Sequence, residues 1–186
     1  MADPGFARLV SLACHDLRTP LATVNGFAKT LQRTGQLAER ESHFVDLIDA
    51  AAEQMTSLLD LLGLAARIES GRYEPPYSEA DTLELASSAD ERIATEGSGE
   101  TVETDVVAIR RSLVALARCA SLHGGVPLVT WHVDGRELSL GPLTADAAAV
   151  VTGESPRDLG ALVARLAIER LGGSIAVEGE TLRVSI

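Results

Sequence analysis

His15 is the residue of this chain whose setting is best suited to chemistry. Asp16 follows it directly, and Thr19 stands four residues on, on the same face of a helix. A neutral imidazole, with an unperturbed pKa of about 6.5, is a nucleophile near physiological pH. His15 is therefore either a reactive nucleophile or an ordinary surface histidine. The helix that contains it helps to decide between these two interpretations.

A helical pattern carries these residues. Apolar side chains recur in alternating steps of four and three, the heptad spacing of helices in bundles and coiled coils. They are Phe6, Val10, Ala13, Leu17, Val24, Phe27 and Leu31. His15 lies about 200° around the helix from Ala13 and therefore points away from the bundle core. Pro20 should bend or loosen the helix, but the heptad stays in phase on both sides, so we expect the helix to continue.

A second helix is predicted from about Leu37 to Glu69 by the same stepping. Its apolar positions are Phe44, Ile48, Ala51, Met55, Leu58, Leu62 and Ala65. Gly35 and Gly71 end the two helices, which form an antiparallel helical hairpin. A hairpin alone leaves an apolar face uncovered, and a homodimer that closes a four-helix bundle covers it economically. The alternative is that the C-terminal half covers this face.

The rest of the chain alternates between short helical and strand patterns. Helices are expected over residues 78–93, 106–122, 144–151 and 159–171, and a loop over 96–100. Strands are expected over residues 102–104 and in two hairpins, 128–140 and 174–186. The predicted fold class is therefore α+β, a helical hairpin followed by a small sheet with helices to one side.

Seven consecutive residues, His15 to Leu21, resemble the phosphoacceptor box of two-component histidine kinases, His-Glu/Asp-Leu-Arg-Thr-Pro-Leu. The resemblance implies that His15 takes and passes on a phosphoryl group, and that the hairpin dimerises. It also implies that Asp16 accepts a proton or orients the imidazole, and that Thr19 holds a position linked with water positioning in phosphatase activity. Arg18 either pairs with the phosphoryl group or is an ordinary surface charge.

The second half is similar to the ATP-binding domain of the same kinases, a Bergerat-type α/β sandwich. Residues 105–120 align with its N-box helix, and residues 157–186, with the ending Leu171-Gly172-Gly173-Ser174-Ile175, align with its last helix and strands. The resemblance implies two domains: a dimerisation and histidine phosphotransfer hairpin over residues 1–71, and a degenerate ATP-binding-like domain over 72–186.

The nucleotide motifs of that domain are missing. The positions aligned with the N-box asparagine hold Ala115 and Cys119, and neither replaces a hard oxygen ligand for Mg²⁺. Residues 141–146 lack the Asp-x-Gly-x-Gly turn. The glycine-rich segment before the last helix begins with Asp158, which would repel phosphate at that helix N-terminus, and little chain remains for an ATP lid. We therefore expect no bound cofactor: ATP and Mg²⁺ binding is lost, and a partner receiver domain supplies Mg²⁺.

Composition restricts the partners. The formal net charge of −11 argues against sequence-independent binding to nucleic acid or an anionic membrane. No signal peptide or apolar span of about 20 residues is recognisable, so a cytoplasmic location is expected. Cys14 and Cys119 are expected to be free thiols. His43, His123 and His132 have no ligand spacing among them, so no metal site is expected.

An intact acceptor box beside missing nucleotide motifs favours a phosphorelay protein of a two-component system. In this hypothesis a homodimeric histidine phosphotransferase exchanges phosphate between His15 and the aspartate of a response-regulator receiver domain, without autophosphorylation from ATP. An upstream hybrid kinase is a further candidate partner. The alternatives are an active sensor histidine kinase with a divergent ATP site, and a non-catalytic dimeric regulator that binds receivers or kinases.

Overall fold

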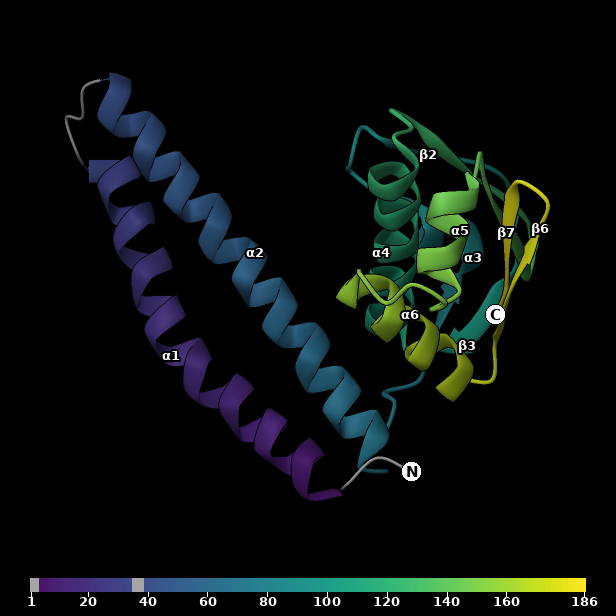
Figure 1. Cartoon of the computed structure of the whole chain (residues 1–186), viewed down its shortest axis with the longest axis horizontal. Helices are drawn as coiled ribbons and strands as arrows, with labels where there is room; N and C mark the ends of the chain where they lie inside the picture. The colour runs from purple at the N-terminus through teal and green to yellow at the C-terminus, as the bar shows by residue number, and fades with distance from the viewer. Residues whose placement is uncertain (1–3, 35–38) are drawn as a thin grey trace. The chain divides into compact units, whose positions relative to one another are not determined.

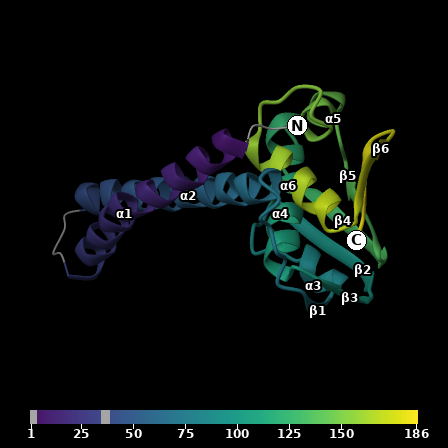
Figure 2. The ribbon, with the colours of Figure 1, turned by 90° about the horizontal axis from the view of Figure 1, so that it is seen from below.

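The computed structural model of the chain describes residues 4–34 and 39–186; the side chains of residues 4–9, 11–13, 16 and 34 lie outside this description. The chain divides into two compact units, Met1–Arg72 and Tyr73–Ile186. Figures 1 and 2 show a hairpin of two long helices in the first unit and a mixed sheet with helices in the second. None of the described helices is long and apolar enough to cross a membrane.

The first unit consists of α1 (Pro4–Thr34) and α2 (Glu39–Glu69), which run side by side as a hairpin (Figures 1 and 2). The helix α1 continues through Pro20, as the phase of the heptad predicts. Small and aliphatic side chains at intervals of seven are buried along α1, namely Cys14, Leu21 and Ala28. They match a row of buried side chains on α2, among them Val45 and Ala52. This row is the contact between the two helices.

A second apolar row on each helix is exposed. Its members have relative exposures between 40% and 67%: Leu17, Val24, Phe27, Leu31, Phe44, Leu47, Ile48, Met55 and Leu58. Most of them belong to the predicted heptad. Rows three residues apart lie about 60° from each other around a helix, so each helix has an apolar face wider than one seam. The hairpin covers one row and leaves the other outside.

The second unit contains seven strands and four helices within residues 73–186. The strands are β1 (Ser78–Asp81), β2 (Ile93–Gly99), β3 (Thr101–Thr104), β4 (Val129–Gly135), β5 (Glu137–Gly141), β6 (Ser174–Glu178) and β7 (Thr181–Ser185). The helices are α3 (Thr82–Ala86), α4 (Val106–Gly124), α5 (Ala145–Val151) and α6 (Leu159–Arg170).

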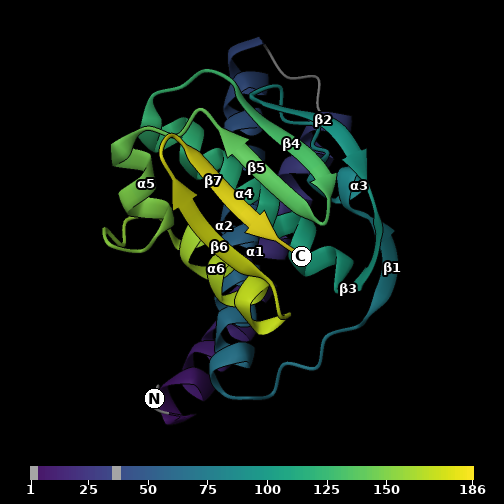
Figure 3. The same ribbon diagram turned by 90° about the vertical axis from the view of Figure 1, so that its right-hand side faces the viewer.

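Five strands form one sheet in the order β2-β4-β5-β7-β6, and β1 pairs with β3 in a separate ribbon. The pair β2–β4 is parallel, and the other neighbours are antiparallel. Figure 3 shows the sheet with α4 and α6 behind it. Between these layers lies an aliphatic core around Trp131 of β4, with Leu116 of α4 and Ile168 of α6 fully buried. The predicted α+β class is confirmed.

Local signals placed several elements correctly. Asp105 caps α4, because its Oδ1 accepts a hydrogen bond of 2.9 Å from the Ala108 N–H, and its Oδ2 accepts one of 2.7 Å from the buried Tyr73 hydroxyl. Gly125 ends α4 in the left-handed conformation that glycine adopts without strain. The predicted hairpins β4–β5 and β6–β7 are also present.

The prediction of a helix over residues 78–93 is wrong, and so is the loop over residues 96–100. The first segment contains β1, α3 and a loop, and most of the second belongs to β2. A Cβ at Gly97 would lie 2.1 Å from the Val133 carbonyl oxygen on β4. This glycine therefore permits close approach of two strands, which local sequence alone does not distinguish from a loop.

The loop before β2 is tied to α4 by ion pairs. Asp90 Oδ2 lies 2.8 Å from Arg92 Nη2 and 2.9 Å from Arg118 Nε of α4. Hydrogen bonds from Arg92 and then Arg118 hold the pKa of the Asp90 carboxyl well below its ordinary value, against the opposing effect of burial.

Candidate functional site

His15 lies on α1 with an exposed side chain, one residue after the buried Cys14. A step of one residue turns about 100° around a helix, which takes the imidazole off the row that contacts α2. Thr19 is exposed as well, one turn further along the same side. Asp16 belongs to α1, but its side chain lies outside the described residues. The box thus presents His15 and Thr19 on one accessible face.

Arg18 is engaged with the other helix of the hairpin. Its Nη2 atom lies 2.8 Å from Asp60 Oδ1 on α2. The guanidinium passes over Gly63, where an added Cβ would lie 3.6 Å from Arg18 Nη2. Arg18 therefore links α1 to α2 next to His15, and its pairing with a phosphoryl group stays a prediction.

The arrangement around His15 suits transfer of a group to or from another macromolecule. An exposed imidazole on a long helix is open to a partner that brings its own reacting group and metal ion. Phosphoryl transfer asks of the protein mainly positioning and neutralisation of charge. An exposed histidine at a fixed place on a helix is able to supply the nucleophile for such a step.

A second cluster of reactive side chains lies between α4 and α6. Cys119 and His123 come from α4, and Asp158 caps α6 by accepting a hydrogen bond of 2.9 Å from the Ala161 N–H. His123 Nε2 lies 3.4 Å from Asp158 Oδ2. One ligand atom from each of the three residues lies within 4.8 Å of the other two, so among the described residues this group is able to hold a metal ion.

The environment of Cys119 suppresses thiolate chemistry. The residue is fully buried. Burial raises the pKa of the thiol to about 12, with a further contribution from the negative charge of Asp158. At neutral pH the sulfur is therefore a protonated thiol and a poor nucleophile. Cys119 is not a candidate for covalent catalysis.

Sequence reasoning missed this cluster. The histidines have no ligand spacing among themselves, so their positions in the sequence do not indicate a metal site. The usable signal was the interval of four residues between Cys119 and His123, which places both on one face of a helix. The third member, Asp158, joins them only because α6 packs against α4.

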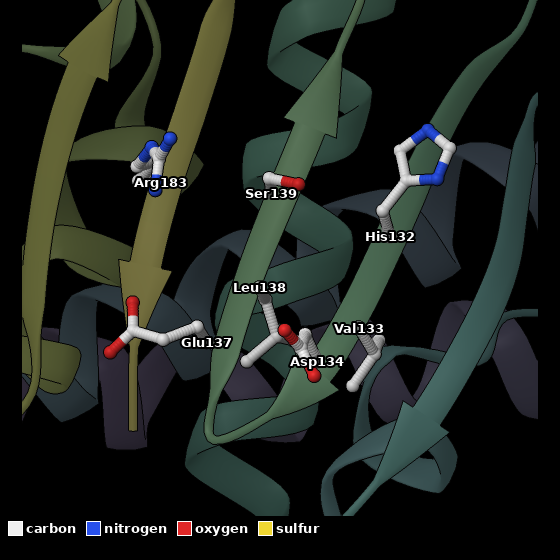
Figure 4. A pocket seen from close by; sticks show the side chains of 7 residues that line it. All are labelled: His132, Val133, Asp134, Glu137, Leu138, Ser139 and Arg183. Atoms are coloured by element: carbon white, nitrogen blue, oxygen red, sulfur yellow. The ribbon is translucent and has the colours of Figure 1, made fainter.

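A shallow hollow of about 210 Å³ lies on the sheet. It is lined by His132, Val133, Asp134, Glu137, Leu138, Ser139 and Arg183, which Figure 4 shows on β4, β5 and β7. His132 Nδ1 lies 2.8 Å from Glu96 Oε1, and Arg183 Nε lies 2.7 Å from Glu178 Oε2. Both basic groups are thus paired with carboxylates beside the hollow, and we assign it no role.

Comparison with known proteins bears on the hairpin first. The His Kinase A (phospho-acceptor) domain family, HisKA, matches residues 7–71. The probable sensor histidine kinase TcrY of Mycobacterium tuberculosis is 38% identical over 65 residues, 35% of this chain and 14% of that protein. The sensor protein DivL of Caulobacter vibrioides is 31% identical over 78 residues, 42% of this chain and 10% of that protein. The similarity therefore spans a small part of these relatives.

Solved structures extend the likeness to the whole chain. The crystal structure of full-length ShkA in complex with AMPPNP has a TM-score of 0.65 and 19% identity, covering 95% of this chain and 44% of that one. The Acinetobacter baumannii histidine kinase AdeS has a TM-score of 0.54 and 19% identity, covering 92% of this chain and 96% of that one. Such identities establish the fold alone. Together with the HisKA match over residues 7–71 and the similarity to sensor histidine kinases, they support a two-component histidine kinase core, in which a hairpin that matches a phospho-acceptor domain is followed by a domain of the kinase-like fold.

Proposed function

We propose that this protein is a histidine phosphotransferase of a two-component system that does not use ATP itself. His15 accepts a phosphoryl group from the aspartyl phosphate of a receiver domain, or donates one to a receiver aspartate. The exposed position of His15 within a HisKA match supports the first part of this proposal. The residues at α4 and at the start of α6 support the second part, the absence of ATP use.

The observation that carries the proposal is the capping of α6 by Asp158. In the kinases that the second half resembles, a glycine-rich segment precedes this helix, and its N-terminus is suited to bind phosphate. Here Asp158 Oδ1 accepts the hydrogen bond from the Ala161 N–H at 2.9 Å. A carboxylate thus fills the place of an anion and repels a second one. Ala115 and Cys119 stand at the positions that align with the magnesium-holding asparagine, and Cys119 is fully buried near Asp158.

The transfer step needs little from this chain. A ring nitrogen of His15 attacks phosphorus, the bond between phosphorus and the aspartate oxygen breaks, and the carboxylate leaves. The resulting phosphohistidine loses its excess proton to solvent or to a nearby base such as Asp16. The receiver brings Mg²⁺, which neutralises the phosphoryl oxygens. Thr19 is placed to orient water if the protein also acts as a phosphatase on its partner.

We also propose that the protein acts as a homodimer. Among the side chains of the hairpin that the structure describes, nine large apolar ones are at least 40% exposed, along one row on α1 and another on α2. Contiguous apolar patches of this kind mark interaction surfaces in soluble proteins. A second hairpin covers both rows at once and closes a four-helix bundle.

Incubation of the full chain with a phosphorylated receiver domain tests the proposal. The wild type should acquire acid-labile phosphate, and His15→Gln should acquire none. His43→Gln is the matched control, because His43 is another exposed histidine of the hairpin and should behave as the wild type. Absence of label on the wild type with a panel of receivers would refute phosphotransfer.

An active kinase is the second candidate. It is favoured by the 38% identity of the hairpin to a probable sensor histidine kinase and by the likeness of the fold to ShkA, whose structure contains AMPPNP. Labelled ATP with Mg²⁺ and no receiver would then phosphorylate His15. A third candidate, a non-catalytic regulator, would bind receivers equally well as wild type and as His15→Gln, with no label on either.

A further inference from the structure

The cluster between α4 and α6 has the composition of a metal centre. We propose that Cys119, His123 and Asp158 form a binding site for a transition-metal ion of the Zn²⁺ class. All three residues belong to the second unit, and the proposal does not depend on phosphotransfer.

The positions of the three residues follow from two helices. Cys119 and His123 are one turn apart on α4 and so share a face, and Asp158 stands at the start of α6, which packs against α4 (Figure 1). His123 lies in the last turn of α4, where the carbonyl end of the helix favours positive charge. The three side chains therefore converge from two elements that are fixed in the core.

The separations suit coordination better than they suit an ion pair. His123 Nε2 and Asp158 Oδ2 are 3.4 Å apart. A charge-assisted hydrogen bond prefers about 2.7–2.9 Å, whereas two ligands of a tetrahedral zinc ion lie roughly 3.3–3.8 Å apart. The three ligand atoms lie within 4.8 Å of one another, so the widest pair has to close by at most about 1.5 Å. Side-chain rotations have to supply this movement.

The ligand types select the metal. Thiolate sulfur, imidazole nitrogen and one carboxylate oxygen suit Zn²⁺ or Co²⁺, and they do not suit Mg²⁺, which prefers oxygen ligands in octahedral geometry.

The three ligands differ in their exposure to solvent. Cys119 is fully buried, whereas the side chains of His123 and Asp158 are each 21% exposed. An ion can therefore enter from the side of His123 and Asp158 and keep a water molecule as its fourth ligand. The two carboxylate oxygens of Asp158 have separate roles, because Oδ1 accepts from the Ala161 N–H, which fixes the carboxylate, and Oδ2 faces His123.

Metal binding also changes the state of the buried thiol. Without an ion, the raised pKa of Cys119 keeps it protonated beside a carboxylate. A bound cation stabilises the thiolate, and the proton is released to solvent. Coordination therefore links α4 to α6 through one ion and stabilises the folded second unit by mass action.

Cobalt titration of the full chain tests the proposal. The protein is first treated with EDTA and kept reduced, and Co²⁺ is then added while absorbance is recorded. The wild type should bind one ion per chain, with a thiolate-to-cobalt charge-transfer band and the visible bands of tetrahedral cobalt, and Zn²⁺ should displace it. Cys119→Ser should lose the charge-transfer band, whereas Cys14→Ser, which changes the other buried cysteine, should keep it.

Two further variants separate ligation from folding. Asp158→Asn retains an acceptor for the helix cap, so α6 should stay capped while the affinity for Zn²⁺ falls more than about 10-fold. His123→Ala should lose affinity to a similar degree, and the exposed His132→Ala should not. Circular dichroism without metal verifies that each variant is folded. Absence of the charge-transfer band in folded wild type, or its persistence in Cys119→Ser, would overturn the proposal.

Discussion

Replacement of Phe27 by alanine is predicted to weaken the proposed homodimer without unfolding the hairpin. Phe27 stands on the uncovered row of α1 and is 67% exposed in the single chain. Few of its contacts can therefore be with its own chain, and truncation should leave the helical content nearly unchanged. Its apolar surface is available to a second hairpin, and the effect should appear in the dimer equilibrium.

The magnitude follows from the exposed fraction. Full burial of a phenylalanine side chain contributes about 1.5–3 kcal/mol. Burial of the remaining 67% then contributes about 1–2 kcal/mol in each protomer, and two-fold symmetry doubles this to about 2–4 kcal/mol. Phe27→Ala should therefore raise the dimer dissociation constant roughly 30- to 700-fold.

Sedimentation equilibrium over a range of concentrations measures this constant. Leu122 is a matched control, because it is 68% exposed but lies on α4, outside the hairpin. Leu122→Ala should leave the dissociation constant unchanged. A wild type that stays monomeric at high concentration, or a Leu122→Ala variant that is weakened as much as Phe27→Ala, would refute the assignment of this face to dimerisation.

Three predictions concern the second unit. Asp90→Asn should lower the free energy of unfolding by about 1–2 kcal/mol at pH 7, since Asp90 loses ion pairs to two partly exposed arginines. The folded-state pKa of Asp90 lies below its ordinary value of 3.8, so the stability difference between wild type and variant is complete above pH 3.8 and shrinks as the pH falls. Urea titrations should therefore show a smaller difference at pH 3 than at pH 7. An equal difference at both pH values would contradict this prediction. Tyr73→Phe should cost about 1–2 kcal/mol in thermal unfolding, because the buried Asp105 carboxylate loses a hydrogen bond of 2.7 Å; an unchanged midpoint would show that this bond contributes nothing. Burial raises the pKa of the Cys119 thiol to about 12, so Cys119 should resist alkylation by iodoacetamide at pH 8 in EDTA-treated native protein. Mass spectrometry follows the labelling. Rapid labelling would show that the thiol is more reactive than its burial implies.

Features set by neighbouring residues could be predicted from the sequence. The unbroken phase of the heptad predicted that α1 continues through Pro20, and it does. Asp105 and Gly125 likewise indicated the two ends of α4. The pair Asp134-Gly135 indicated the hairpin between β4 and β5. Each of these signals acts within a few residues of its effect, which is why a single sequence reveals it.

Features set by packing could not be predicted in this way. The strand β2 exists because it pairs in parallel with β4, more than thirty residues away, and its glycines resemble a loop until that partner is known. The division of the hairpin's apolar face into a covered and an exposed row depends on how two helices meet. For the candidate site, the box identified His15, but the pairing of Arg18 with Asp60 needed α2 in place.

The approach of Asp158 to Cys119 and His123 belongs to the same class. The sequence spacing between Asp158 and the two residues of α4 does not predict this approach, because it depends on the packing of α6 against α4. The sequence did place a carboxylate at the start of α6. Its role as the cap of that helix appears only with the geometry of the Ala161 N–H.

Calorimetric titration of the folded full chain with ATP in the presence of Mg²⁺ measures whether this chain binds the nucleotide that could phosphorylate His15. We expect no saturable binding at nucleotide concentrations up to about 1 mM, equivalent to a binding free energy weaker than about −4 kcal/mol. Saturable binding of one nucleotide per chain in the micromolar range, accompanied by phosphate on His15, would contradict the proposed phosphotransfer without ATP.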